Sequence, residues 1–412
     1  MSDQAVVSLG NFLLTVILAR SLSRVEYGTY VVLYGALLTA NSLHAALVTY
    51  PISVLGAHRT PRELRLLSSN SLIITSLLGV PVSAVLILAA WIITRRTDLL
   101  LFVIAAMLCW QFQETLRRSL MSHLRHRRAL LGDSVTYVGE VIIVYWIVHT
   151  SAHVTARAGF EAILVASLVG AMIHAVGLGL RWPRLAESLR LAREYFALGR
   201  FPMLSSLGYA GTLLLVPWVL AFKGLAEVAG YQAMMNIVQV VNPVMFSVGN
   251  LVIPAVAHEL LKPAGDAGAR RVTYRYMLEG TALLAPIFAA ILIAPDLIMR
   301  TVYGRLSGYA EHDVLLRVMV LGGCGLYFSH VLYCYLLGKK RVTAVAKSQL
   351  LASSAVVLCA LILIPIWGLS GAVIAFIAMG TVRSWALLVA IRRDSRRSIA
   401  VDRYTVSMEE AS

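Results

Sequence analysis

The chain has 412 residues and a net charge of +15, with 59% hydrophobic and only 14% charged residues. Long apolar runs recur along its whole length, and no stretch between them could form a soluble domain. Twelve runs approach or exceed the roughly 20 residues that a membrane-spanning helix needs. They predict an all-α polytopic membrane protein and span residues 5–22, 27–52, 68–93, 99–116, 129–149, 161–181, 201–222, 229–256, 276–299, 314–337, 346–367 and 369–391.

The basic residues follow a topological pattern. With the N-terminus placed inside, 26 of the 36 lysines and arginines fall in the six inner segments, which are residues 58–67, 117–128, 181–200, 257–275, 338–347 and 392–412. The positive-inside rule predicts this asymmetry. The excess charge therefore reflects topology and attraction to anionic lipid headgroups, so no nucleic acid partner is expected. Both termini are predicted to be cytoplasmic.

The two halves of the chain resemble each other. Residues 21–30 (SLSRVEYGTY) are similar to residues 224–232 (GLAEVAGYQ). Residues 124–130 (LRHRRAL) and 336–342 (LLGKKRV) each follow the fourth predicted helix of their half. Six helices separate the copies, so both have the same orientation in the membrane. This predicts two six-helix lobes related by a parallel internal repeat about an axis along the membrane normal.

The expected domains follow from this repeat. They are an N-terminal six-helix lobe (1–185), a cytoplasmic linker (186–200), a C-terminal six-helix lobe (201–392) and a cytoplasmic tail (393–412). Around the linker, apolar residues stand at helical spacing, and they are Leu185, Leu189, Ala192 and Phe196. This spacing predicts an interfacial helix.

Polar residues share one face of the second and eighth predicted helices. In the second helix they lie at i, i+4, i+11 and i+14, and they are Tyr30, Tyr34, Asn41 and His44. Similar spacing in the eighth helix joins Asn236, Gln239, Pro243, Ser247 and Asn250. Such side chains either hydrogen-bond between packed helices, at about 0.6 kcal/mol each, or line a polar cavity. If the side chains line a cavity, the candidate substrate-binding residues among them are Asn41, His44, Asn236, Gln239 and Asn250.

The fourth predicted helix ends in a charged cluster. Glu114 reaches Arg117 and Arg118 at i+3 and i+4. The cluster is either a plain topology signal or a receiving site for an anionic headgroup at the cytoplasmic mouth. On the second interpretation its three members are candidates for gating.

The fifth predicted helix carries two acidic residues on one face. Asp133 lies near the inner surface, where Arg128 or Arg117 could pair with it. Glu140 is twelve residues past Arg128, about 18 Å into the membrane. A carboxyl at this depth must be protonated or have a cationic partner. Each acid is therefore either structural or a coupling or gating group.

Arg383 lies inside the twelfth predicted helix, nine residues before Arg392. That spacing is about 13.5 Å, close to half of a hydrocarbon core of roughly 30 Å. Snorkelling, a pair with Glu140 and a cation facing a cavity are the three alternatives. His174 is its rough counterpart in the first half. A cavity with cations at depth suits an anionic substrate, and phosphate matches arginine best.

Two segments that partly resemble motifs of soluble enzymes do not match them in full. The segment GKKR at 338 lacks the upstream glycine and downstream Ser or Thr of a phosphate-binding loop. The segment HELLK at 258 has lysine where a second zinc-binding histidine would stand. We therefore expect no catalytic residue, no metal and no cofactor.

Three segments show a family resemblance. They are residues 3–32 (DQAVVSLGNFLLTVILARSLSRVEYGTYVV), 113–137 (QETLRRSLMSHLRHRRALLGDSVTY) and 224–244 (GLAEVAGYQAMMNIVQVVNPV). They resemble bacterial O-antigen and exopolysaccharide flippases of the multidrug/oligosaccharidyl-lipid/polysaccharide exporter superfamily. The resemblance implies two lobes around a central cavity, alternating access, and transfer of a polyprenyl-pyrophosphate-linked oligosaccharide across the bacterial inner membrane.

On this interpretation Arg383 and His174 would hold the pyrophosphate, and the polar stripes would contact the sugars. The expected partners are the anionic lipid-linked oligosaccharide and the lipid bilayer, with a polysaccharide polymerase as a candidate protein partner. The main alternative is a proton- or cation-coupled drug or small-molecule antiporter on the same scaffold, with Glu140 as its deep carboxylate. A lipid II flippase would be expected to have two more helices. A membrane glycosyltransferase or ligase would need larger outer loops than residues 150–160 and 300–313 provide.

Overall fold

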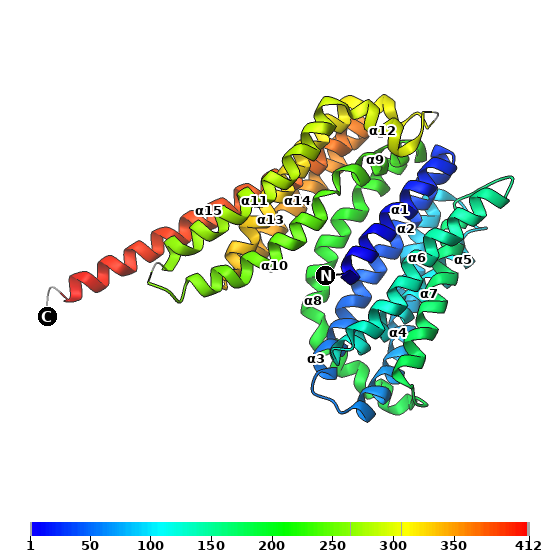
Figure 1. The fold of residues 1–412 in the computed structure, drawn as a ribbon, viewed down its shortest axis with the longest axis horizontal. Coiled ribbons are helices and arrows are strands. Elements are labelled where there is room, and N and C mark those ends of the chain that lie inside the picture. The colour runs from blue at the N-terminus through cyan, green and yellow to red at the C-terminus, as the bar shows by residue number, and fades with distance from the viewer. Residues whose placement is uncertain (1, 264, 306, 410–412) are drawn as a thin grey trace. The chain divides into compact units, whose positions relative to one another are not determined.

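A computed structural model describes residues 2–263, 265–305 and 307–409 of the chain. Every regular element in this part is helical, which confirms the predicted all-α class (Figure 1). The elements are α1 (Ser2–Ser21), α2 (Arg24–His44), the π-helix η1 (Ala45–Thr49), α3 (Tyr50–Gly56), α4 (Pro61–Thr94), α5 (Leu100–Ser122), α6 (His126–Thr150), α7 (Arg157–Leu178), α8 (Leu185–Ala221), α9 (Leu225–Val238), α10 (Val241–Glu259), α11 (Gly265–Ile293), α12 (Pro295–Tyr303), the short 3₁₀ helix η2 (Tyr309–His312), α13 (Asp313–Gly338), α14 (Val342–Trp367) and α15 (Leu369–Glu409).

Within the described residues, nine helical spans are long and apolar enough to cross a membrane. A multi-pass membrane protein is thereby confirmed. The other three predicted segments are residues 5–22, 99–116 and 201–222, and they coincide with α1, α5 and α8. The count of twelve crossings and the cytoplasmic termini stay predictions. Met1 and residues 410–412 of the predicted tail lie outside the described residues.

Two predicted helices are interrupted. The second contains the π-helix η1, where the Tyr50 N–H donates to the Ala45 carbonyl five residues back. The eighth breaks into α9 and α10 at Gln239 and Val240. Pro243 explains the second break, because proline has no N–H to donate to the Gln239 carbonyl.

The predicted linker is continuous with the helix that follows it. Residues 186–200 and the predicted span 201–222 both lie in α8, a single helix of 37 residues. Its first turns pack against α4, where the Tyr195 and Ser71 hydroxyls are 2.7 Å apart. Gly199 allows a close approach to η1, since a Cβ at this position would lie 2.5 Å from the Ala46 carbonyl oxygen.

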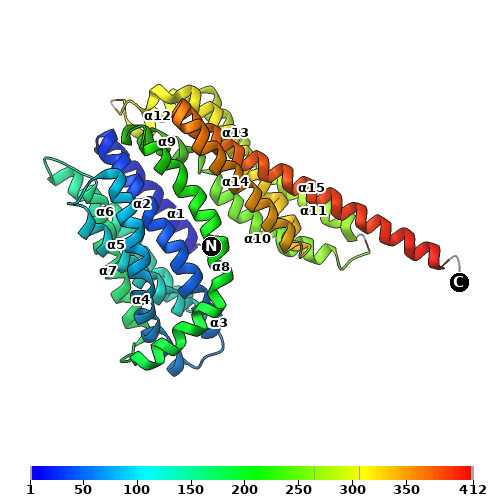
Figure 2. The same cartoon turned by 180° about the vertical axis from the view of Figure 1, so that it is seen from behind.

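The described helices pack into two compact units. The first runs to Asn236 and includes Met299–Ala310, and the second contains Ile237–Ile298 and the chain from Glu311 onwards. In the first unit, α5, α6 and α7 pack on one another, and α1 packs on α6. In the second, α15 packs on α13 and α14, and α10 packs on α11 and α13. Figure 2 shows the same helices from behind. The predicted lobe boundaries stay a prediction.

The segment Met299–Ala310 is held in the first unit by side-chain and main-chain contacts with α1, α2 and α9. The guanidinium of Arg20 donates to the Val302 carbonyl at 2.6 Å. Arg24 donates to the Ser307 carbonyl at 3.1 Å. The Tyr303 hydroxyl donates to the Ala233 carbonyl at 2.9 Å. This far segment of the sequence is therefore an integral part of the first unit.

Helices α5 and α13 end in the same way. The Arg125 N–H donates to the Leu120 carbonyl, and the Arg341 N–H donates to the Leu336 carbonyl, each five residues back. The preceding residue is left-handed in both turns, with φ of 56° at Leu124 and 59° at Lys340. Both are Schellman motifs with a residue other than glycine at the left-handed position. They fall in the two segments whose sequences were predicted to be equivalent.

Candidate functional site

A buried ion cluster joins the end of α5 to the start of α6. Arg117 places Nε 2.5 Å from Asp133 Oδ2 and Nη1 3.0 Å from Glu114 Oε2. Arg118 Nε lies 3.0 Å from Glu114 Oε1. Of the two partners predicted for Asp133, Arg117 forms the pair, whereas Arg128 donates to the Gly177 carbonyl. The two predicted pairs of Glu114 are confirmed. Because Asp133 and Arg117 are buried, the cluster fixes the relative positions of α5 and α6.

His174 belongs to this same cluster. Its Nε2 lies 3.2 Å from the Ala129 carbonyl oxygen and 4.0 Å from Asp133 Oδ1. Gln113 donates to Asp133 Oδ1 at 2.9 Å. A Cβ at position 132 would lie 2.1 Å from His174 Nε2, so Gly132 makes the space that the ring occupies. His174 is thus grouped with the predicted gating residues of the first unit, whereas Arg383 lies in the second.

The polar stripe of the second predicted helix is largely packed. His44 is buried, with Nε2 3.1 Å from Thr115 Oγ1 and 3.2 Å from Thr75 Oγ1. The Thr115 hydroxyl donates its only hydrogen to the Gln111 carbonyl, so His44 Nε2 must be the donor to Thr115. Asn41 is half-buried, and its Oδ1 has no hydrogen-bond partner among the described residues.

The stripe of the eighth predicted helix is split by the break between α9 and α10. Asn236 is buried, accepts from Gln232 at 2.7 Å and donates to the Tyr27 hydroxyl at 3.1 Å. Gln239 and Asn250 are exposed on the second unit. Of the predicted substrate-binding residues, these last two are therefore the exposed ones.

Glu140 is a deeply buried carboxyl without a basic neighbour in the described part of the chain. It is 3% exposed, and no hydrogen bond or ion pair is formed by it within the described residues. The phenols of Tyr30, Tyr34 and Tyr137 lie close enough to interact with it electrostatically. The Tyr30 hydroxyl is also buried without a partner among the described residues.

Arg383 lies in α15 and is 8% exposed. Its guanidinium carbon is 4.9 Å from the centroid of the Tyr333 ring on α13. The His330 ring stacks on Tyr333 at 5.8 Å and lies 3.5 Å from Cys334 Sγ through Nε2. Sequence reasoning missed His330 and Tyr333. Their spacing of three residues in an apolar run was the only available signal.

A second ion cluster ties the start of α11 and the end of α13 to Asp394 within α15, on the side predicted to be inner. Lys339 Nζ lies 2.5 Å from Asp266 Oδ1 and 2.6 Å from Asp394 Oδ2. Arg341 lies 2.6 Å from the other oxygen of Asp394. Burial lowers the pKa of the Lys339 amine, but hydrogen bonds to the two carboxylates outweigh it and raise the pKa. The Lys339 amine is therefore protonated at neutral pH.

No family model and no curated protein matches the sequence. Solved structures do match its fold. An inward-facing multidrug resistance MATE family transporter of the MOP superfamily is 12% identical over 96% of this chain and 95% of its own, with a TM-score of 0.73. The lipid II flippase MurJ in an inward closed conformation is 11% identical over 95% and 86%, with a TM-score of 0.72. The MATE multidrug transporter DinF-BH is 16% identical over 95% and 93%, with a TM-score of 0.63.

These neighbours are transporters and a flippase, not enzymes. At such low identity the likeness concerns the fold alone. The chain is therefore a multi-pass membrane protein with the fold of MOP-superfamily transporters. Its substrate has to be argued from its own residues.

Proposed function

We propose that the protein is a flippase for a polyprenyl-pyrophosphate-linked oligosaccharide, the repeat unit of an O-antigen or exopolysaccharide. Two six-helix lobes with twelve crossings would carry it across the bacterial inner membrane by alternating access. The observation that carries this proposal is Arg383, a buried guanidinium in the middle of the apolar span Leu369–Asp394. A cation there costs about 2.5–3.5 kcal/mol on insertion scales, and an anionic cargo gives it a role. The fold shared with a lipid II flippase supports the same class of substrate.

The residues take separate roles in this proposal. Arg383 forms paired hydrogen bonds with a phosphate, which arginine does better than lysine. Gln239, Asn250 and Asn41 contact the sugars. The buried contacts of His44, Asn236 and His174 suit the support of neighbouring helices. Glu114, Arg117, Arg118 and Asp133 form the inner gating cluster. The bilayer is the second partner, and a polysaccharide polymerase is the proposed protein partner.

Complementation of polysaccharide export tests the role of Arg383. Arg383→Ala should lose most export while the membrane level of the protein stays normal, and Arg383→Lys should keep part of it. Arg317→Ala, at an exposed arginine near the start of α13, is the control and should export normally. Normal export by a well-expressed Arg383→Ala variant would overturn the proposed substrate.

Reporter fusions test the proposed topology. Cytoplasmic signals are expected at Thr60, Arg127, Arg190 and Ala267. Outer signals are expected at Thr97, Ala152 and Ser307. A fusion with the opposite signal would remove a crossing and with it the arrangement of two six-helix lobes.

The second candidate function is a proton- or cation-coupled antiporter for drugs or other small molecules. Glu140 favours it, because a buried carboxyl beside tyrosines can exchange a proton as its surroundings change. Drug resistance conferred by the expressed protein, lost in Glu140→Gln, would favour this function. Export that needs both Glu140 and Arg383, without any drug resistance, would assign Glu140 to coupling in the flippase.

A further inference from the structure

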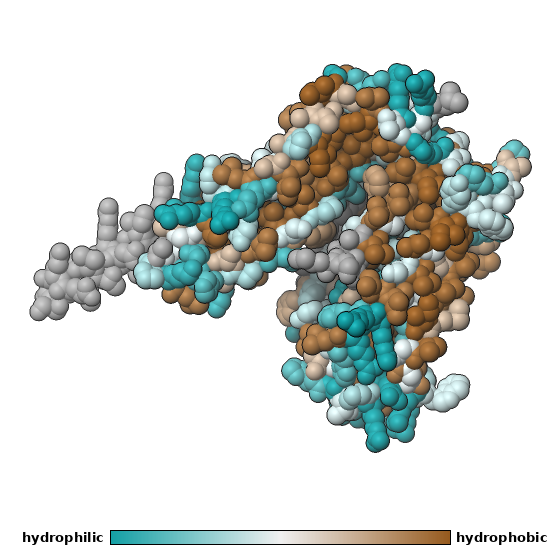
Figure 3. Space-filling model, viewed as in Figure 1, coloured by the Kyte–Doolittle hydropathy of each residue, from teal (hydrophilic) through white to brown (hydrophobic). Residues whose placement is uncertain are grey.

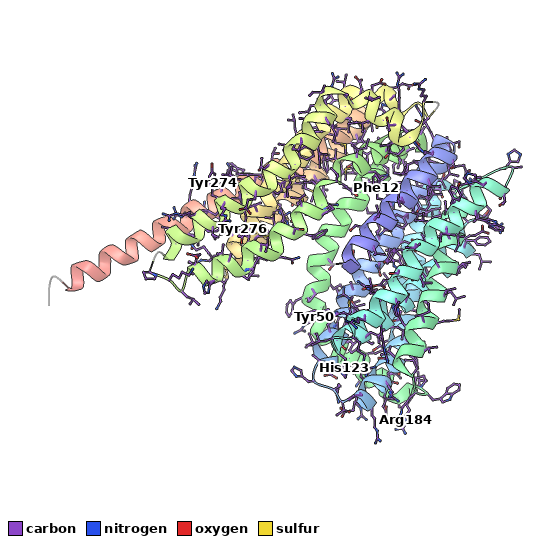
Figure 4. All side chains as sticks on the ribbon, in the orientation of Figure 1. Phe12, Tyr50, His123, Arg184, Tyr274 and Tyr276 are labelled. Atoms are coloured by element: carbon purple, nitrogen blue, oxygen red, sulfur yellow. The ribbon has the colours of Figure 1, made fainter. Side chains whose placement is uncertain are left out.

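The start of α8 presents an apolar face that the first unit leaves uncovered. Leu185 is 60% exposed, Leu189 52% and Phe196 52%, and their spacing places them on one side of the helix. Trp182, just before the helix, is 93% exposed. Figure 4 places the neighbouring Arg184 at one end of the first unit, and Figure 3 shows hydrophilic residues gathered at that end.

The adjoining side of the same turns is fixed to α4. Asn70 Oδ1 accepts from the Arg184 N–H at 3.1 Å and from the Ser188 hydroxyl at 3.2 Å, so α4 caps the start of α8. Ser69 Oγ accepts from the Arg181 N–H at 3.1 Å. These contacts set the rotation of α8 about its axis. They hold the apolar face pointing away from the unit.

Arginines border this face. At 100° per residue, Arg193 and Arg200 lie beside the line of Leu189 and Phe196, and Arg190 lies one step further round. All three are exposed. Residues 181–200 contain five arginines and two glutamates, so the segment is basic. One glutamate, Glu187, pairs with Arg184 at 2.9 Å.

The length of α8, together with the predicted crossing of residues 201–222, places this face. Its 37 residues extend about 55 Å, whereas the hydrocarbon core is about 30 Å thick and an ordinary tilt shortens the helix little. With residues 201–222 crossing the core, as the sequence predicts, roughly the first 16 residues of α8 extend past it. An apolar face with arginines on its border is unfavourable in water, but it fits the headgroup region of a bilayer.

We infer that this face, made of Trp182, Leu185, Leu189 and Phe196 with Arg190 and Arg193 on its border, binds anionic phospholipid headgroups. The apolar side chains enter the outer acyl region, and the guanidiniums meet lipid phosphates. Tryptophan at the interface has the matching preference. The occupant is the bulk anionic lipid of the inner leaflet, and the inference does not depend on the transported substrate.

Lipid titration of the full-length protein in detergent tests the inference. Short-chain phosphatidylglycerol and phosphatidylcholine are added separately, and apparent dissociation constants are read from the thermal midpoint. The double variant Arg190→Gln/Arg193→Gln should bind phosphatidylglycerol more weakly by about fivefold for each arginine removed. Its weaker binding of phosphatidylcholine should be unchanged. Arg190→Lys/Arg193→Lys keeps both charges and should behave like the natural protein.

Two further variants and one further probe complete the design. The double variant Leu185→Ser/Phe196→Ser should bind both lipids more weakly, because both lipids make the apolar contact. The control Arg317→Gln should bind both lipids as the natural protein does. Unchanged phosphatidylglycerol binding in the glutamine double variant would overturn the inference. An equal loss of phosphatidylglycerol binding in the lysine double variant would also overturn it, because the charge of the arginines would then not be responsible. Farnesyl diphosphate is titrated in the same way as a probe for a substrate with a diphosphate group. If the glutamine double variant lost farnesyl diphosphate binding but kept phosphatidylglycerol binding, the inference would also be overturned and the face would be assigned to the substrate.

Discussion

The guanidinium carbon of Arg383 lies 4.9 Å from the centroid of the Tyr333 ring. A cation over an aromatic face at this distance gains about 0.5–2 kcal/mol, with the larger values away from water. The ring therefore stabilises the charge inside the helix bundle and limits the positions that the guanidinium can take. Tyr333 is accordingly a positioning residue for the proposed phosphate contact.

We expect Tyr333→Leu to reduce export about two- to thirtyfold at equal protein level, because the attraction of the ring for the cation is lost. Tyr333→Phe keeps the ring and should retain most export. Tyr274→Leu, at an exposed tyrosine of α11, is the matched control. If Phe and Leu were equally harmful, the hydroxyl and not the ring face would be the active feature.

Asp133→Asn should destabilise the protein by about 3–5 kcal/mol, because Arg117 would keep its buried charge without a full counter-ion. Thermal unfolding in detergent measures the loss. The double variant Arg117→Met/Asp133→Leu removes both charges and should recover much of the stability. A double variant as unstable as the single one would show that the pair contributes through its hydrogen-bond network instead.

Gly132→Ala should destabilise by about 1–3 kcal/mol through overpacking, since its Cβ would lie 2.1 Å from His174 Nε2. Gly139→Ala is the control on the same helix, where the nearest atom to a Cβ is 3.5 Å away. Alanine there should be neutral or stabilising by up to about 1 kcal/mol. Thermal midpoints in detergent compare the two. Equal midpoints would mean that His174 moves aside at no cost.

Leu124→Gly should raise the thermal midpoint. Leu124 is exposed and left-handed, with φ of 56°, a conformation that costs about 1–2 kcal/mol for residues with a Cβ. The greater freedom of glycine in the unfolded chain offsets part of this gain. Leu131→Gly, at an exposed position inside α6, should lower the midpoint instead. A fall in both variants would show that the turn tolerates leucine without strain.

Local spacing was sufficient for part of the candidate site. The pairs of Glu114 with Arg117 and Arg118 follow from helix geometry alone, and Asp133 was within reach of few cations. The stripe expected along the eighth helix is divided by the break at Gln239 and Val240, and only Gln239 and Asn250 of its predicted substrate-binding residues are exposed. Contacts between side chains of different helices could not be predicted from the spacing of residues within one helix. The position of Arg383 over Tyr333 depends on the packing of α13 and α15, which no single periodicity encodes.

The limits of the helices were less predictable than their existence. Pro243 could have indicated the break between α9 and α10, because a missing N–H ends the preceding turn. By contrast, Pro202 lies inside α8 without interrupting it, so a proline alone does not locate a boundary. The π-helix after His44 has no composition signal in its residues, AALVT. Close packing against Gly199 accompanies it.

The assignment of Met299–Ala310 to the first unit has a consequence for synthesis. Arg20 and Arg24 emerge from the ribosome nearly 300 residues before the carbonyls that they bind. An N-terminal fragment ending at Asn236 would therefore lack the last piece of its own unit. During translation, the helices of the first unit therefore enter the bilayer before their unit can be completed. The carbonyls that bind Arg20 and Arg24 are synthesised only when most of the chain has been made.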